Sequence, residues 1–148
     1  MREIVFALEF KGSAAPVAGT EGKLTAKTTA TSQVWRTIVK DDGVQATVEP
    51  AGGAGATFES EVQIVGEGAF VESGTIAYGT AGRLHFKTVG QGVLGQSPTD
   101  GLQRGAVIWE ITRGEGRLAG AQGIITSNFT VGAQGEVVDD HVVRVFLP

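Results

Sequence analysis

Short runs of alternating apolar and polar residues, separated by glycine-containing breaks, dominate the pattern of this chain. The first run places Ile4, Phe6, Leu8 and Phe10 at every second position. Because successive side chains of a strand point to opposite sides, this run predicts a strand whose even-numbered face lies in the core. Many such runs, with breaks roughly every 8 to 12 residues, predict one antiparallel sheet closed into a barrel of about eight to ten strands.

The same alternation predicts further strands at residues 23–29, 34–40, 44–49, 57–65, 68–79, 83–89, 106–113, 124–132 and 136–146. The turn Asp41-Asp42-Gly43 predicts a tight hairpin, because glycine accepts the positive φ that such turns need. Residues 12–22, 50–56 and 90–105 are expected to be connections, and the last of these is a place where a ligand gate could lie. Glycines interrupt every helical spacing, so at most one short helix is expected.

Composition is that of a globular protein. The chain has 148 residues, of which 41% are hydrophobic and 19% charged, and this predicts a single domain spanning residues 1–148. It contains no cysteine, which excludes a disulfide scaffold, a thiol nucleophile and a thiolate metal site.

Charge disfavours two classes of partner. The net charge of −4 comes from 16 acidic and 12 basic residues that are scattered along the chain, without a basic stripe or patch. Nucleic acid and membrane partners are therefore not expected. Residues 1–10 lack the uninterrupted apolar core of a signal peptide, and no apolar run reaches the length of a spanning helix. We expect a cytoplasmic protein.

A glycine-rich segment near the C-terminus carries a family resemblance. Gly114, Gly116, Leu118, Gly120 and Gly123 match the GTGxLxGxxG stretch that precedes the penultimate strand in small calycin-like barrels of the allene oxide cyclase type and their bacterial relatives. Dirigent proteins, which share that barrel, carry a comparable turn. The resemblance covers the last third of the chain, from residue 83 onward.

The resemblance implies an eight-stranded antiparallel barrel with an apolar interior, often assembled as a dimer or trimer. Catalytic members of that group steer cyclisation or rearrangement of a hydrophobic substrate mainly by confining it. The matching glycines shape a turn and carry no catalytic role to this chain.

Three residues are candidates for proton transfer. His85 alternates with apolar Leu84 and Phe86, and its imidazole suits proton transfer at neutral pH if that face points inward; otherwise it lies on a solvated charged face. Glu110 lies in the apolar segment 106–112 and is either a buried acid, base or ligand anchor, or an outward carboxylate paired with a cation on a neighbouring strand. Tyr78, at a strand end, could polarise a carbonyl.

Five further residues are candidates for substrate binding. Large aromatic side chains either fill a barrel core or line a pocket, while polar side chains that interrupt apolar runs could orient a ligand. His141 shares a face with several valines and is a candidate for either a hydrogen-bonded core residue or a ligand contact. The five are Trp35, Arg36, Trp109, Asn128 and His141.

No motif predicts a metal or cofactor. The two histidines are far apart in sequence, and neither a metal-binding His spacing nor a phosphate-binding loop is present. Together with the resemblance, the barrel pattern favours a cofactor-independent cyclase, isomerase or lyase acting on a hydrophobic small molecule in the lumen. The alternatives are a carrier or sensor of a lipophilic metabolite, and a filled barrel that acts through assembly.

Several strands carry apolar residues on both faces. Val5 and Ala7 alternate with Phe6 and Leu8, so one face fills the barrel while the other needs cover. We therefore expect a homo-oligomer.

Overall fold

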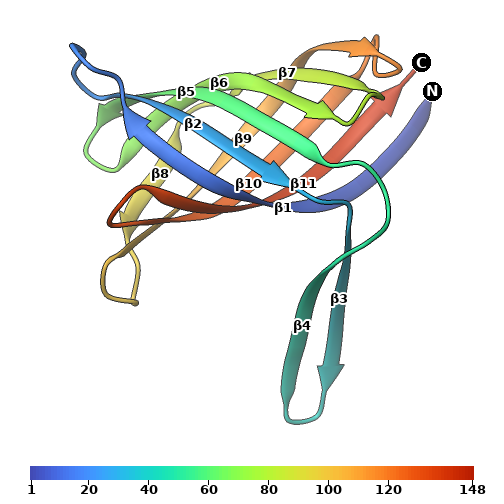
Figure 1. The fold of residues 1–148 in the computed structure, drawn as a ribbon, viewed down its shortest axis with the longest axis horizontal. Helices are drawn as coiled ribbons and strands as arrows, with labels where there is room; N and C mark the ends of the chain where they lie inside the picture. The colour runs from blue at the N-terminus through green and yellow to red at the C-terminus, as the bar shows by residue number, and fades with distance from the viewer.

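The computed structural model describes all of residues 1–148 and consists of eleven strands without a helix. Figure 1 shows the strands as a barrel, with both termini at one end and a separate hairpin below it. The strands are β1 (Arg2–Pro16), β2 (Lys23–Ala30), β3 (Gln33–Lys40), β4 (Gly43–Pro50), β5 (Ala56–Gly66), β6 (Ala69–Tyr78), β7 (Gly82–Thr88), β8 (Gly92–Gln96), β9 (Leu102–Gly116), β10 (Gln122–Gly132) and β11 (Glu136–Leu147).

Antiparallel pairing closes the sheet. The strand order is β10-β11-β1-β2-β5-β6-β7-β9-β8, and the additional pairing of β10 with β9 joins the two ends. Strands β7 and β8 share one place in the wall, because both pair with β6 on one side and β9 on the other. The predicted barrel is confirmed, with eight strand positions around its circumference.

The sequence pattern located most strands and turns, but two predicted connections are partly wrong. Residues 12–16 continue β1, because they pair with β2. Residues 92–96 form β8, and β9 already begins at Leu102, because these segments pair with each other. Small residues hid both extensions, since glycine and alanine weaken the alternation without preventing ladder hydrogen bonds.

Aromatic rings fill the middle of the barrel. Phe58, Phe86 and Trp109 are each at most 2% exposed, and the ring centroids of Phe86 and Trp109 lie 4.3 Å apart. Phe10 joins them from β1, where the even-numbered face lies in the core as predicted.

Two inward-facing glycines let the wall bend. Gly12 lies opposite Thr28, and Gly74 lies opposite Ser60. A Cβ atom added at either glycine would lie 2.1 Å from a backbone oxygen of the neighbouring strand. Close backbone approach of this kind is how a sheet coils tightly enough to close.

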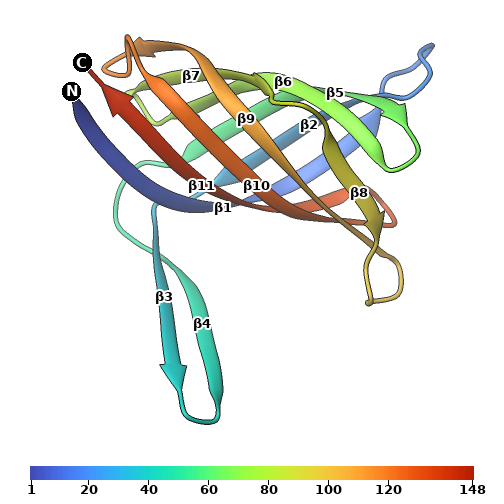
Figure 2. The same cartoon turned by 180° about the vertical axis from the view of Figure 1, so that it is seen from behind.

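Strands β3 and β4 form a two-stranded hairpin outside the barrel. Lys40 pairs with Gly43, so Asp41 and Asp42 form the turn and Gly43 takes a φ of +151°. The predicted hairpin is confirmed. Figure 2 shows it projecting from the end of the barrel that holds the termini. The structure contains no helix of the length and apolar character needed to cross a membrane.

Candidate ligand site in the barrel lumen

A cavity of about 310 Å³ lies in the end of the lumen away from the termini. Most of its wall is apolar, and Phe58 in the aromatic cluster bounds it on the inner side. Four polar side chains line the same cavity: Thr28, Glu72, Gln103 and Asp139.

Glu72 is a buried carboxylic acid on β6. Its side chain shares the inward face with Phe70 and Ile76, and Ser60 on β5 donates a 2.5 Å hydrogen bond to its Oε2. Burial raises the pKa of Glu72 from its ordinary value of 4.5 to about 8, and repulsion from Asp139 adds to this rise. The Ser60 hydroxyl and the nearby Trp109 indole lower that pKa, but they do not offset burial. Glu72 is therefore protonated at neutral pH and can donate a hydrogen bond.

Asp139 on β11 is the second acid of the cavity. Ser127 on β10 donates a 2.6 Å hydrogen bond to its Oδ1, and His141 Nε2 lies 2.9 Å from its Oδ2. All three side chains are buried. Two donors thus hold the Asp139 carboxyl group in one orientation at the cavity wall.

The two acids have matching surroundings. Each carboxyl group accepts a hydrogen bond from the hydroxyl of a serine that lies 12 residues earlier, on the preceding strand of the same hairpin. Hairpins β5–β6 and β10–β11 lie opposite each other in the strand order. Two Ser–acid pairs, Ser60–Glu72 and Ser127–Asp139, therefore face one lumen from opposite walls.

His141 is enclosed by aromatic rings. Its ring centroid lies 4.4 Å from that of Phe10, 5.4 Å from Phe58 and 5.1 Å from Trp109. Nε2 faces the Asp139 carboxyl, while Nδ1 has no hydrogen-bond partner. This network assigns the proton to Nε2, and it makes His141 a residue that positions Asp139.

One buried hydroxyl at the cavity is also without a partner. Thr28 is 3% exposed, and its Oγ1 makes no hydrogen bond within the protein. Buried polar atoms usually have partners, so this hydroxyl is available to a ligand.

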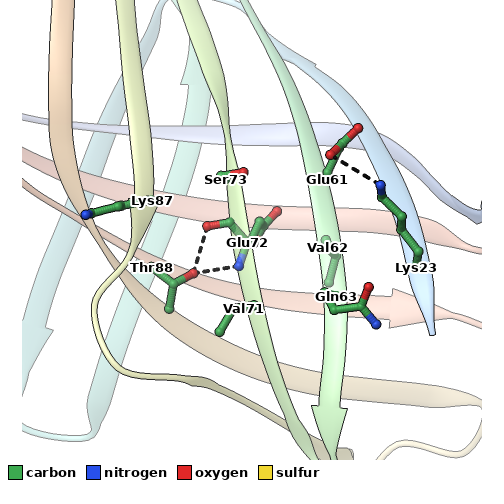
Figure 3. Close-up of a pocket in the computed structure, with 9 residues that line it drawn as sticks. All are labelled: Lys23, Glu61, Val62, Gln63, Val71, Glu72, Ser73, Lys87 and Thr88. Carbon is green, nitrogen blue, oxygen red and sulfur yellow. Dashed lines mark hydrogen bonds and ion pairs between the residues drawn. The ribbon is translucent and has the colours of Figure 1, made fainter. Parts of the chain in front are cut away.

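The Thr88 side chain on β7 fixes the backbone of Glu72. The Thr88 hydroxyl accepts from the Glu72 N–H at 2.7 Å and donates to the Glu72 carbonyl at 2.8 Å (Figure 3). On the outer surface around this contact lies a polar groove of about 360 Å³, where Lys23 Nζ is 3.7 Å from Glu61 Oε2. These two hydrogen bonds fix the Glu72 backbone at the point where the pairing of β7 with β6 ends.

His85 and Glu110 lie on the outer face of the barrel. His85 Nε2 is 3.0 Å from Glu115 Oε2, and this contact lowers the pKa of Glu115. Glu110 Oε1 is 3.3 Å from Lys87 Nζ on the neighbouring strand, the outward arrangement that the sequence left open. Neither side chain reaches the cavity, because the inward positions of these strands belong to residues such as Phe86 and Trp109.

Three other candidates also lie outside the lumen. Trp35 and Arg36 belong to the projecting hairpin, and both are exposed. Asn128 is exposed because its side chain points outward from β10, whereas that of the adjacent Ser127 points inward and is buried. These residues were predicted for a lumen site, and the barrel geometry places none of them there.

Tyr78, Trp109 and His141 do point into the barrel. Tyr78 lies toward the end with the termini, next to Phe6, and lines a separate depression of about 260 Å³. Burial raises the pKa of its unpartnered hydroxyl. Trp109 and His141 belong to the aromatic cluster that bounds the cavity.

Glu72, Asp139 and Thr28 were not among the residues predicted for the site. Glu72 and Asp139 each stand on the apolar face of an alternating run, and this position could have identified them. The repeated spacing of 12 residues from a serine was a second signal.

No group of three or more His, Cys, Asp or Glu side chains is arranged to hold a metal ion. No protein-family model, no curated protein and no solved structure matches this chain. The geometry of the lumen is therefore the basis for a functional proposal.

Proposed function

We propose that this barrel binds a small, mainly apolar molecule whose polar end is uncharged or cationic. The observation that supports this most directly is the 310 Å³ apolar cavity in which a protonated Glu72 and Asp139 meet. Small-molecule sites commonly combine apolar walls of this volume with a few convergent polar groups.

The polar groups limit which ligand charge is compatible. Glu72 can donate a hydrogen bond to a carbonyl oxygen, and Thr28 offers an unpartnered hydroxyl. No lysine or arginine lines the cavity. A ligand carboxylate would lie beside two acids without a compensating cation, so its burial is unfavourable.

A matched series of naphthalene compounds tests the proposal. We expect 2-acetonaphthone, which carries a ketone, and 2-naphthylmethylamine, which carries an ammonium group, to bind with sub-millimolar affinity in calorimetric titrations at pH 7. We expect 2-naphthoate to bind at least tenfold more weakly. Equal binding of all three compounds would contradict the charge argument, and binding of none would contradict the site.

The pH dependence of ligand binding provides a second test. Above pH 8 Glu72 loses the proton that it donates to a ketone, so acetonaphthone binding should weaken between pH 7 and 9. The ammonium ligand should bind more tightly over the same range, because ionised Glu72 places a negative charge beside it. Glu72→Leu should abolish both trends, and Ala26→Phe should weaken all binding by filling the cavity.

Acid–base catalysis is a second candidate function. Two carboxyl groups in different surroundings at one cavity favour it. Glu72, which burial keeps protonated, would act as the acid, and Asp139 is the proposed base. Cofactor-independent isomerisation, cyclisation or elimination of an apolar substrate fits this pair, in line with the allene oxide cyclase resemblance.

The probe 5-nitrobenzisoxazole tests for such chemistry. A base removes its C3 proton, the C–H electrons complete the nitrile, and the N–O bond breaks to leave a nitrophenolate. We expect turnover that Asp139→Asn lowers at least tenfold and that Glu110→Gln, an exposed control, leaves unchanged. Turnover no faster than that caused by acetate would remove the catalytic candidate and leave a carrier or sensor.

A further inference from the structure

The projecting β3–β4 hairpin has one apolar face without cover. Its cross-strand pairs Trp35–Val48, Thr37–Ala46 and Val39–Val44 lie on that face and include no charged residue. Arg36, Lys40 and Glu49 are on the opposite face. Trp35 is 38%, Val44 66% and Val39 78% exposed. An isolated two-stranded hairpin is marginally stable in water. We therefore expect another surface to cover this apolar face.

The hairpin is anchored at its root in a defined orientation. The Gln33 side chain accepts a hydrogen bond from the Glu9 N–H at 2.8 Å and donates one to the Glu9 carbonyl at 2.9 Å. These two hydrogen bonds attach β3 to β1. The Trp35 indole N–H donates to the same Gln33 amide oxygen at 3.1 Å. Because that N–H already has a partner, the Trp35 ring can be buried without leaving a polar group unsatisfied.

The barrel wall next to this root carries a matching apolar surface. Ala7, Val142, Thr126 and Ile108 lie side by side across β1, β11, β10 and β9. Val142 is 48% and Ile108 46% exposed. Val5 and Ile124 are each 49% exposed and lie in the next row along the barrel, on either side of Arg144. We call these six residues the wall patch.

The hairpin stands away from its own wall patch. Val48 lines a groove of about 420 Å³ between the hairpin root and the outer wall, together with Glu9 and Lys11. Figures 1 and 2 show that the rest of the hairpin extends away from the barrel. The apolar face therefore cannot rest on the wall patch of the same chain.

We propose that the hairpin of one chain packs on the wall patch of a second copy, and that the second hairpin packs reciprocally on the first. Strands of eight residues make the hairpin roughly 26 Å long, and its face is roughly 10 Å wide. One such contact buries on the order of 500 Å², counting both surfaces, and two bury on the order of 1,000 Å². Only the reciprocal arrangement reaches the area that a specific interface needs.

Light scattering coupled to size-exclusion chromatography tests the dimer. The unaltered chain should elute at twice its monomer mass of 15.3 kDa. Trp35→Glu and Val142→Glu should each yield monomers. Two controls should remain dimeric: Thr47→Glu on the opposite face of the hairpin, and Thr57→Glu on the exposed surface of β5.

Other outcomes would overturn this assignment. A monomeric unaltered chain at 100 µM or a trimer excludes reciprocal pairing, as does a dimer that survives Trp35→Glu. A dimer that Trp35→Glu disrupts but Val142→Glu does not excludes the wall patch as the receiving surface. Far-UV circular dichroism reports whether each variant folds, and Trp35→Ala, expected to weaken the dimer at least tenfold, gives a milder second variant. The lumen proposal is independent of these results.

Discussion

Glu72 and Asp139 lie four strand positions apart in either direction around the eight-position barrel, and both line one cavity. Each is held by a serine of its own hairpin. Repulsion between the two acids helps to keep Glu72 protonated. Burial, aided by this repulsion, therefore makes Glu72 a hydrogen-bond donor in an apolar cavity, and this has measurable consequences.

Glu72→Gln should remove a pH-dependent loss of stability. In the unfolded chain the Glu72 carboxyl releases its proton near pH 4.5, whereas in the folded chain it keeps the proton until about pH 8. The stability that this group contributes is thus fully present below pH 4.5 and is lost as the pH rises to 8, at up to roughly 1.4 kcal/mol per pH unit. Thermal unfolding between pH 4 and 9 measures this effect.

The control for that experiment is Glu110→Gln, which alters an exposed carboxylate. It should keep the pH profile of the unaltered chain. Parallel profiles for the unaltered chain and Glu72→Gln would show that Glu72 is not kept protonated by burial.

Ser127→Ala should destabilise the fold by about 1–3 kcal/mol, because it removes a donor from a buried carboxyl group. Urea unfolding gives the free energy. Ser73→Ala, at an exposed position of β6, serves as the control and should change the unfolding free energy by less than about 0.5 kcal/mol. Equal effects of the two substitutions would mean that the Ser127–Asp139 bond adds no net stability.

Gly74→Ala should destabilise the barrel by at least about 2 kcal/mol. The new Cβ would lie 2.1 Å from the Glu59 carbonyl oxygen and 2.8 Å from Ser60 Cα, and backbone cannot move aside without opening the wall. Gly52→Ala is the matched control, since nothing lies within 4 Å of a Cβ there. Chemical denaturation compares the two, and a Gly74→Ala variant as stable as Gly52→Ala would refute the close approach.

His85→Ala should leave lumen binding unchanged, because His85 contacts Glu115 and Arg113 on the outer face. Titration with 2-acetonaphthone before and after the substitution measures this. An affinity loss above threefold, with unchanged thermal stability, would indicate a path from the outer face to the cavity.

The alternation of residues was enough to predict an antiparallel barrel, the even-numbered inward face of β1 and the hairpin at Asp41 to Gly43. A period of two depends on neighbouring residues alone, and it decides which side chains share a face. The short strand β8 was not predictable in this way, because its glycines carry no face preference and only pairing with β6 and β9 makes it a strand.

The site depended on information that local pattern does not contain. Alternation placed His141 on an apolar face, but it did not decide whether the faces of His85 and Glu110 pointed inward. That choice is made when the barrel closes, because register then assigns every alternating face to the lumen or to the outside.

What the sequence by itself determined is thus most of the strands and the partition of their residues between two faces, since both follow from side-chain geometry along one strand. Tertiary structure alone decided that Glu72 and Asp139, 67 positions apart, meet at one cavity. It also decided that the hairpin stands free of the wall. The physical reason is that strand order and register bring distant residues together, and burial then changes their protonation.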